Sequence, residues 1–335
     1  MKKRHLILID SELKGREYGT LNAFNEAIIK ITSGDTLILP KKTKFENRFF
    51  QSSNFRCLRK FSRKTNLKNI TENKYDVVWY ICMGPENYRF DLMYGIENIK
   101  NRVIYFFDTL PHQFSLIKKL KISRSFNIQI SSFDDAINIL ERMANSKWHF
   151  IQQASSLEYF PKKSIAEKEI AFASFGRGNL MLNDIIQEFC DSHGLIFDRT
   201  HETSGQILTN NELLYKSYCR SLSNAVFNIC FSVEHTDPNR SGVLSPITCR
   251  WYESFLARNI VLGIQPKNSL FNQIFPKNFV YELNEKDTKE NILLRLEELW
   301  ENREALYSQL YENSNYDVRN YDWDNRIIEI LELTD

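Results

Sequence analysis

Short, almost continuous apolar runs alternate with amphipathic segments along this chain, in two separate series. The run YDVVWYICMG at 75–84 is apolar throughout most of its length, as expected of a parallel strand that is buried on both faces. The segment TLNAFNEAIIKITSG at 19–33 carries apolar residues at helical spacing, which predicts an amphipathic helix that stops at a glycine. Strands and helices that alternate in this way predict an α/β fold with mostly parallel sheets.

The two series are separated by a polar, proline-bearing segment at 152–169, which is typical of a linker. In the first series we expect further strands at 5–10, 35–40, 102–108 and 126–131, and a helix at 132–146 capped by Ser132. In the second series we expect strands at 169–174, 195–200, 225–232 and 259–266, and helices at 182–194, 211–223, 245–259, 288–306 and 321–333.

The chain has 335 residues, a length that suits two domains of about 150 residues each. Apolar residues make up 42% of the chain, so both domains can bury a core. The six cysteines are scattered and never form a Cys-x-x-Cys pair, which indicates free thiols in a reducing compartment. No apolar run is long enough for a signal peptide or a membrane span. We therefore expect a cytoplasmic protein.

Charge is distributed unevenly. Residues 1–75 hold seventeen Lys or Arg against seven Asp or Glu, and residues 281–335 hold fifteen acidic against six basic residues. Solvated helix faces explain both regions, and for the acidic one we prefer that interpretation. In the basic region, KKTKFENRFF (41–50) and RCLRKFSRK (56–64) interleave cations with aromatics, which also suits anionic lipid headgroups on the inner face of a membrane or a phosphate-bearing acceptor. We expect no nucleic-acid partner, since only this block would support one.

The segment 245–259 carries the strongest functional signal. Ser245 is placed to cap a helix and Pro246 to occupy its first position, and the free N–H groups of such a first turn form an anion site. Arg250 and Glu253, three residues apart on one face, would then meet a phosphate and a ribose. An ordinary surface Arg–Glu pair explains the same spacing.

A second signal is the turn FGRGN at 175–179, which follows an apolar strand and opens a helix. Gly176 and Gly178 let the backbone turn tightly beside a ligand, and Arg177 would face the same sheet edge as the 245–259 helix. The G-x-G-x-x-G fingerprint of dinucleotide-binding proteins is missing.

Three parts of the second series carry a family resemblance: NICFSVEHTDPNRSG (228–242), ITCRWYESFLARNIVLGIQP (247–266) and the pattern of Trp323 and Arg326. They resemble the C-terminal domain of bacterial GT-B glycosyltransferases that build surface polysaccharides. The resemblance covers about 165–333. It implies an α/β fold of two Rossmann-like domains that face a central cleft, with residues 1–155 on the acceptor side and 156–315 binding the nucleotide sugar. A C-terminal helix at 316–335 would cross back to the N-terminal domain.

The resemblance also implies roles for individual residues. Arg177, beside Gly176, and Arg250 would bind the diphosphate, Glu253 the ribose, and Thr248 a phosphate. His235 and Arg240 would face the phosphate or the sugar of the donor. Many relatives carry another glutamate eight residues before the one that corresponds to Glu253. Ser245 occupies that position here. The carboxylate that helps to place the donor sugar in retaining members is therefore missing from that position.

The expected reaction moves a sugar from a nucleoside-diphosphate donor to a saccharide or lipid-linked acceptor. We expect no cofactor and no metal, because fixed arginines and a helix N-terminus can stabilise the leaving diphosphate and no Asp-x-Asp metal motif is placed at the site. An inverting enzyme needs a general base, for which Asp10, Asp108 and His112 at predicted strand ends are candidates. A sugar-nucleotide epimerase and a non-catalytic nucleotide-sugar-binding subunit stay open as alternatives.

Overall fold

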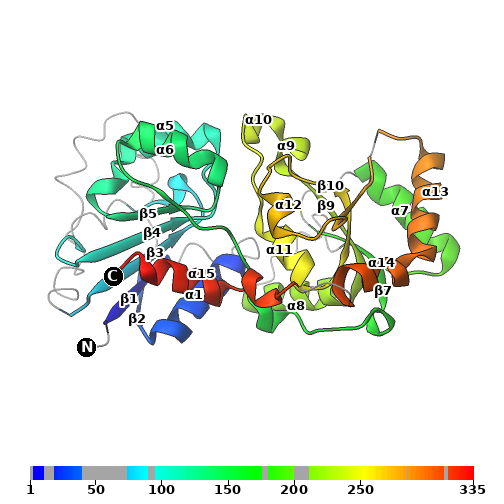
Figure 1. Cartoon of the computed structure of the whole chain (residues 1–335), viewed down its shortest axis with the longest axis horizontal. Coiled ribbons are helices and arrows are strands. Elements are labelled where there is room, and N and C mark those ends of the chain that lie inside the picture. The colour runs from blue at the N-terminus through cyan, green and yellow to red at the C-terminus, as the bar shows by residue number, and fades with distance from the viewer. Residues whose placement is uncertain are drawn as a thin grey trace. The chain divides into compact units, whose positions relative to one another are not determined.

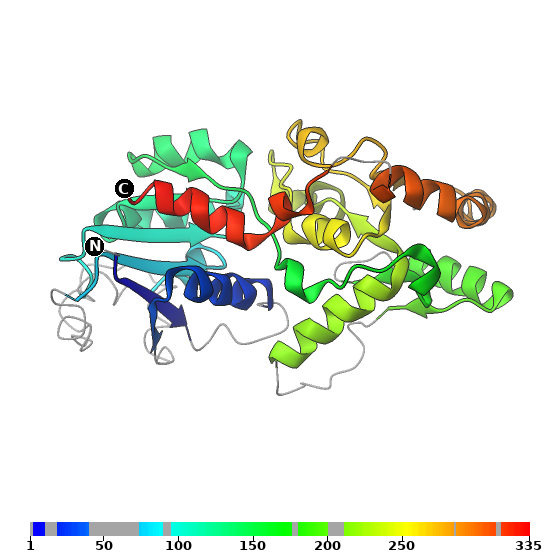
Figure 2. The same cartoon turned by 60° about the horizontal axis from the view of Figure 1, so that its bottom comes forward.

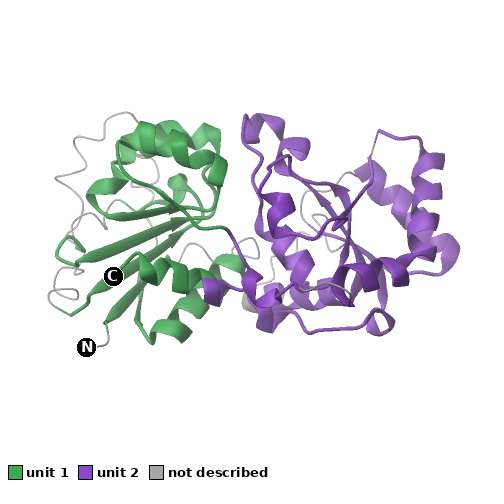
Figure 3. Ribbon diagram, viewed as in Figure 1, with its two compact units in different colours: residues 1–152, 326–335 green, residues 153–325 purple. Residues whose placement is uncertain are grey.

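A computed structural model of the chain describes residues 3–10, 19–39, 74–89, 95–175, 180–199, 211–284, 286–312 and 316–335. The chain divides into two compact units, which Figure 3 distinguishes by colour. Unit 1 comprises residues 1–152 together with 326–335, and unit 2 comprises residues 153–325. The division at 152/153 lies at the start of the polar segment that the sequence marks as a linker.

Unit 1 is built on a six-stranded parallel sheet in the order β2-β1-β3-β4-β5-β6 (Figure 1). The strands are β1 (His5–Asp10), β2 (Asp35–Leu39), β3 (Val77–Cys82), β4 (Asn101–Phe106), β5 (Ile128–Ser131) and β6 (His149–Phe150). Every residue of β3 is buried, because this strand lies inside the sheet with both of its faces covered.

Helices cover both faces of this sheet. α1 (Gly19–Thr32) lies on one face, while α5 (Phe114–Leu120) and α6 (Ile137–Ala144) lie on the other, as the rotated view of Figure 2 shows. Short 3₁₀ segments occupy Pro85–Asn87, Pro111–Gln113, Ile122–Arg124 and Asp134–Ala136. This placement follows from right-handed crossovers that run in opposite directions from β1.

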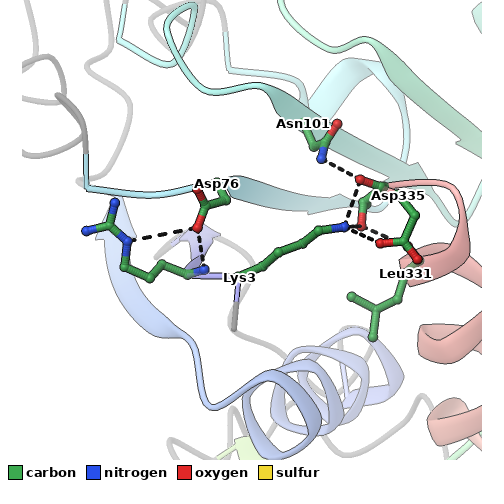
Figure 4. A network of polar contacts seen from close by, with 7 residues as sticks. Lys3, Asp76, Asn101, Leu331 and Asp335 are labelled. Carbon is green, nitrogen blue, oxygen red and sulfur yellow. Dashed lines mark hydrogen bonds and ion pairs between the residues drawn. The ribbon is translucent and has the colours of Figure 1, made fainter. Parts of the chain in front are cut away.

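The C-terminal residues of the chain also belong to unit 1. α15 (Trp323–Glu332) contributes Ile327 and Ile330, both fully buried. Beyond it, the Thr334 carbonyl accepts from Asn101 Nδ2 at 2.6 Å and from Lys3 Nζ at 2.9 Å, and Lys3 forms an ion pair with Asp335 (Figure 4). These contacts fix the C-terminal segment to the amino-terminal ends of β1 and β4.

Unit 2 is built on a five-stranded parallel sheet in the order β11-β10-β9-β7-β8. Its strands are β7 (Ile170–Ser174), β8 (Phe197–Asp198), β9 (Ala225–Phe231), β10 (Ile260–Ile264) and β11 (Val280–Glu282). Its helices are α7 (Leu180–His193), α8 (Asn211–Asn224), α9 (Val233–Thr236), α10 (Pro238–Ser241), α11 (Cys249–Leu256), α12 (Phe271–Ile274), α13 (Lys289–Glu301) and α14 (Arg303–Tyr307). Single helical turns occupy Leu157–Tyr159, Ile165–Glu167, Ser308–Glu312 and Val318–Tyr321.

Aromatic side chains fill much of the core of unit 2. Phe255 on α11 lies 4.3 Å from Tyr321, 5.6 Å from Phe279 and 5.9 Å from Phe275, measured between ring centroids. Such contacts stabilise more than their buried area alone. This cluster holds the C-terminal half of α11 in place, and so positions the first turn of the same helix.

Most predicted elements occur within a few residues of their expected bounds, and the α/β prediction is confirmed. Ser132 is not a helix cap, because its hydroxyl donates to the Phe107 carbonyl and the helical turn starts only at Asp134. The predicted 288–306 helix is divided into α13 and α14 at Asn302.

Within the described parts of the chain, no helix is both long and apolar enough to cross a membrane. The cysteines that the structure describes, Cys82, Cys190, Cys219, Cys230 and Cys249, are free thiols. Cys57 and the basic segments at 41–50 and 56–64 lie outside the described residues, so contact with anionic lipid stays a prediction.

Candidate functional site

The topology of unit 2 defines where a ligand can bind. β7 connects outward to β8, and the chain then returns to β9 on the other side of β7. Helices that leave two neighbouring strands toward opposite faces open a crevice at the carboxyl ends of those strands. Ser174 pairs with Ile229, and Phe231 pairs with Ile264, so β7, β9 and β10 end at similar levels. The crevice is therefore expected at the carboxyl edge of β7 and β9.

α11 starts at this edge, but later in the sequence than predicted. The helix begins at Cys249, and Thr248, with φ −90° and ψ 165°, is its N-cap residue. Ser245 is not the cap, because its hydroxyl donates to Glu234 Oε1, and Pro246 precedes the helix. The Thr248 side chain does not cap the helix either. The first turn consequently retains backbone N–H groups that no side chain caps.

A line of buried polar contacts fixes α11 against β9. Asn228 in β9 donates through Nδ2 to Ser254 Oγ at 2.7 Å, and Ser254 Oγ donates to the Arg250 carbonyl at 2.6 Å. Asn228 and Ser254 are both buried. Arg250 therefore stands on a turn whose position relative to β9 is set by hydrogen bonds as well as by apolar packing.

Several donor atoms at this edge are buried and have no partner among the described residues. They are Arg250 Nη1, Thr248 Oγ1 and Ser232 Oγ. Arg250 Nη2 approaches the Phe231 carbonyl at 3.4 Å. The guanidinium therefore lies beside Phe231, the last residue of β9, which directly precedes Ser232. Buried polar atoms are rarely left unpaired, so this edge has the composition of a site for an anionic ligand.

Glu253 lies one turn further along α11 and is buried, with 3% of its surface exposed. Its Oε1 accepts from the Tyr215 hydroxyl at 2.7 Å and its Oε2 from the Tyr218 hydroxyl at 2.8 Å. Burial raises the pKa of Glu253, while the two tyrosine hydrogen bonds and the charge of Arg250 oppose that rise. Each carboxylate oxygen can accept a second hydrogen bond.

The sequence did not single out Tyr215 and Tyr218 as neighbours of Glu253. Tyr215 also contacts Ser155 Oγ at 3.1 Å, whereas Tyr218 is less buried. Their signal in the sequence is the i, i+3 spacing in YKSY, which places both on one face of α8. Burial and then the charge of Glu253 raise the pKa of both hydroxyls well above the ordinary value.

His235 and Arg240 lie on α9 and α10, two short helices in the segment between β9 and α11 where the sequence predicted a loop. The His235 ring stacks on Phe231 at the end of β9, with 5.4 Å between ring centroids. The Arg240 backbone N–H donates to Asp237 Oδ1 at 3.2 Å, which caps α10. Gly176 and Arg177 lie outside the described residues, although β7, which leads to them, ends at the same edge as β9.

Unit 1 repeats the topology of unit 2, with its own crevice expected between β1 and β3. Asp10 ends β1 and is buried against Arg89, with Oδ1 and Nη1 3.8 Å apart. Asp108 follows β4, and its N–H donates to the Met83 carbonyl at 2.6 Å. His112 lies four residues on and is exposed. All three candidate bases therefore lie at the carboxyl edge of this sheet.

A carboxylate that the sequence analysis did not consider, Glu86, lies at the same edge of unit 1. Its Oε2 accepts from Gln113 Nε2 at 2.6 Å, and Gln113 Oε1 accepts from the Leu110 N–H at 2.9 Å. A Cβ at Gly84 would lie 2.7 Å from the Gln113 amide and 2.8 Å from the Glu86 carboxylate. The pair therefore packs directly over the glycine that follows β3.

Metal ligands do not gather at either edge in the described part of the chain, where no group of three or more His, Cys, Asp or Glu side chains is arranged to hold an ion. The expected independence from metal stays a prediction.

Two kinds of solved structure share the architecture of the whole chain. HepE from Anabaena, in complex with UDP and glucose, is 12% identical, with 99% of this chain and 100% of that chain covered and a TM-score of 0.51. Sucrose-phosphate synthase from Thermosynechococcus elongatus is 9% identical, with 99% and 98% covered and a TM-score of 0.55. No protein-family model and no curated protein sequence matches the chain. At such low identity the likeness establishes the fold alone, and this fold is GT-B, with two Rossmann-like units.

Proposed function

We propose that this chain is a glycosyltransferase whose nucleoside-diphosphate sugar binds at the carboxyl edge of β7 and β9 in unit 2. The observation that carries the proposal is the set of buried donors without partners in the described chain, Arg250 Nη1, Thr248 Oγ1 and Ser232 Oγ. They gather where α11 begins, and the N-terminal end of a helix favours negative charge. A diphosphate supplies that charge. The UDP and glucose in the HepE complex are ligands of the proposed kind in a protein of the same fold.

In this proposal Arg250 forms charge-assisted hydrogen bonds to the diphosphate, and Thr248 adds a hydroxyl donor. Arg177, three residues after the end of β7, is assigned a second contact to the diphosphate. His235 and Arg240 face the phosphate or the sugar. These groups act chiefly when the bond to the sugar breaks, because negative charge then builds on the leaving diphosphate.

Glu253 accepts from the ribose hydroxyls in the same proposal. Both of its oxygens already accept from tyrosines, so the ribose either uses their second lone pairs or displaces one hydroxyl. Tyr218 is the one to be displaced, because it is less buried than Tyr215, which is also held by Ser155.

The acceptor is assigned to unit 1. A saccharide or lipid-linked hydroxyl loses its proton to a carboxylate or imidazole at the carboxyl edge of that sheet. Asp108 and His112 suit this step better than Asp10, whose carboxylate is buried against Arg89. A role in surface polysaccharide or glycan assembly in the cytoplasm, without a metal and with the basic region against anionic lipid, completes the proposal.

A thermal-shift panel of UDP, GDP, CDP and dTDP tests the proposal. A ligand at 100 times its dissociation constant stabilises the folded protein by about 2.7 kcal/mol, so one nucleotide should raise the melting temperature clearly. If none of the four shifts the melting temperature at millimolar concentration, the proposed function is wrong.

The same preparation separates a transferase from an epimerase. The matching nucleotide sugar, incubated without acceptor, stays largely intact with a transferase. An epimerase is expected to invert a ring carbon, so that an isomeric nucleotide sugar forms, or free nucleoside diphosphate and sugar where water also cleaves the bond to the diphosphate. Either product, formed rapidly without acceptor, therefore favours the epimerase.

A further inference from the structure

One acceptor stands among the donors at the carboxyl edge of β9. Glu234 lies on α9, three residues after Phe231, the last residue of β9. Its Oε1 accepts from the Ser245 hydroxyl and from the Lys267 backbone N–H, the latter at 2.9 Å. Its Oε2 is buried and has no hydrogen-bond partner in the described chain.

Only one of the two carboxylate oxygens of Glu234 is needed to hold the neighbouring segments together. Oε1 alone joins α9 to the segment before α11 and to the segment after β10. Burying an ionised oxygen without a donor is costly, so Oε2 is expected to receive one from a bound molecule. The ligand proposed to carry an anion to Arg250 and Thr248 can supply that donor.

The main chain keeps Glu234 close to those donors. The Ser232 N–H donates to the Ile264 carbonyl at 2.9 Å, and the N–H groups of His235 and Thr236 both donate to the Ser232 carbonyl at 3.2 Å. Arg250 Nη2 approaches the carbonyl of Phe231, the residue just before Ser232. A single short stretch of chain therefore carries Glu234, Ser232 and the backbone that Arg250 contacts.

We infer that Glu234 binds ring hydroxyl groups of the donor sugar through Oε2. It would thereby select sugars that carry a hydroxyl on the ring carbon nearest to Oε2. The inference rests on the proposed function, because the diphosphate bound by Arg250 brings the sugar to this edge. Ser245 and the Lys267 N–H are positioning groups, since they fix Oε1 and thereby the direction of Oε2.

Glu234→Gln tests this inference, because the amide keeps an oxygen for Ser245 and Lys267 but presents NH₂ where Oε2 stood. Isothermal titration with UDP and UDP-glucose, and with GDP and GDP-mannose, measures the two ligand types separately. We expect the dissociation constant of the nucleotide sugar to rise about tenfold or more, since a hydrogen bond to a charged group is lost. The dissociation constant of the nucleoside diphosphate should stay within about twofold, because its contacts are unchanged.

A positioning variant and a control complete the set. Ser245→Ala leaves Oε1 with the Lys267 N–H alone, so Oε2 is held less firmly and nucleotide-sugar binding should weaken by about threefold. Glu282→Gln removes an exposed carboxylate at the end of β11, two strands from β9, and should change neither constant.

The outcomes separate the inference from the proposed function. Equal affinity of Glu234→Gln and the unaltered protein for UDP-glucose, or equal losses for UDP and UDP-glucose, overturns the inference while the nucleotide site stands. If the unaltered protein binds no nucleoside diphosphate, the proposed function fails and the inference fails with it. Should Glu234→Gln not fold, an unchanged affinity of folded Ser245→Ala for the nucleotide sugar overturns the inference.

Discussion

Lys168 is a buried lysine that joins three elements at the amino-terminal end of β9, the opposite end of the strand from the proposed site. Its Nζ donates to the carbonyls of Ser223, Ala225 and Ala257, each at 2.9 Å. These carbonyls belong to the end of α8, the start of β9 and the C-cap of α11. Burial lowers the pKa of Lys168 to about 7, whereas three carbonyl acceptors and two helix C-termini favour the ammonium form.

Lys168→Met should therefore destabilise the protein strongly, because it leaves three buried carbonyls without their donor. Unsatisfied buried groups cost about 1–3 kcal/mol each, so we expect a loss of at least about 3 kcal/mol in the free energy of unfolding. Urea denaturation measures it. Lys162→Met, at an exposed position in the same segment, is the control. Similar denaturation midpoints for the two variants would contradict the bracing role.

Glu253 should make stability depend on pH. Burial raises the pKa of this carboxyl, so the folded protein holds its proton more tightly than the unfolded chain does. Its contribution to stability is then fully present below the ordinary pKa and falls as the pH rises through the raised one. Glu253→Gln cannot ionise. The melting temperature of this variant minus that of the unaltered protein should become more positive between pH 4.5 and pH 7.5. A constant or falling difference would show that the pKa of Glu253 is not raised.

At the scale of elements, the sequence predicts the strands whose side chains are buried along their whole length. The strand over 75–84 is found as β3, with every side chain buried, because a strand inside a parallel sheet cannot tolerate polar residues on either face. β6 and β11 escaped prediction, since two or three residues are too few to show a period.

The start of α11 could not be predicted from its own sequence. Ser245 followed by Pro246 is typical of a helix start, but the hydroxyl of Ser245 is engaged by Glu234, eleven residues earlier. Pairing of Glu253 with Tyr215 and Tyr218 is likewise a contact between helices that are distant in sequence. The predicted strand ends were sufficient to locate the site. The contacts of Ser245 and Glu253 could not be predicted, because they depend on tertiary structure.

Gly263 in β10 shows how tightly the site's strands approach each other. Its φ is +140°, and a Cβ there would lie 2.0 Å from the Cys230 carbonyl oxygen in β9. Gly263→Ala must distort β10 against β9 and should leave little folded protein, as judged by circular dichroism and soluble yield. Gly194→Ala is the matched control, because φ is +65° and no atom lies within 4 Å of its Cβ. It should cost about 1 kcal/mol through backbone strain alone. Equal stability of the two variants would contradict the close approach.

At the scale of the whole molecule, the chain uses one topology twice. In each unit the second strand lies outside the first and the third lies on its other side, so each sheet presents one crevice at its carboxyl edge. The donor atoms without partners at the start of α11 belong to unit 2, and the candidate bases belong to unit 1. Donor and acceptor chemistry are thereby assigned to different units.

The C-terminal segment is expected to stabilise unit 1. Deletion of residues 326–335 removes Ile327 and Ile330, which are fully buried, and the partners of Lys3 and Asn101. Loss of each buried side chain costs about 2–5 kcal/mol, so the truncated chain should melt earlier and be cleaved rapidly within unit 1 by a protease. Deletion of Asp335 alone, an exposed residue, should change little. Equal protease resistance of the full chain and the longer deletion would contradict this role.

The most direct test of the central claim is the affinity of Arg250→Ala for the nucleoside diphosphate that stabilises the unaltered protein most. Hydrogen bonds to charged groups contribute about 1.5–3 kcal/mol, so isothermal titration should show a dissociation constant about 10- to 100-fold higher. Arg295→Ala, an exposed arginine on α13, should bind as the unaltered protein does. A folded Arg250→Ala variant with unchanged affinity would show that the carboxyl edge of β7 and β9 is not where the diphosphate binds.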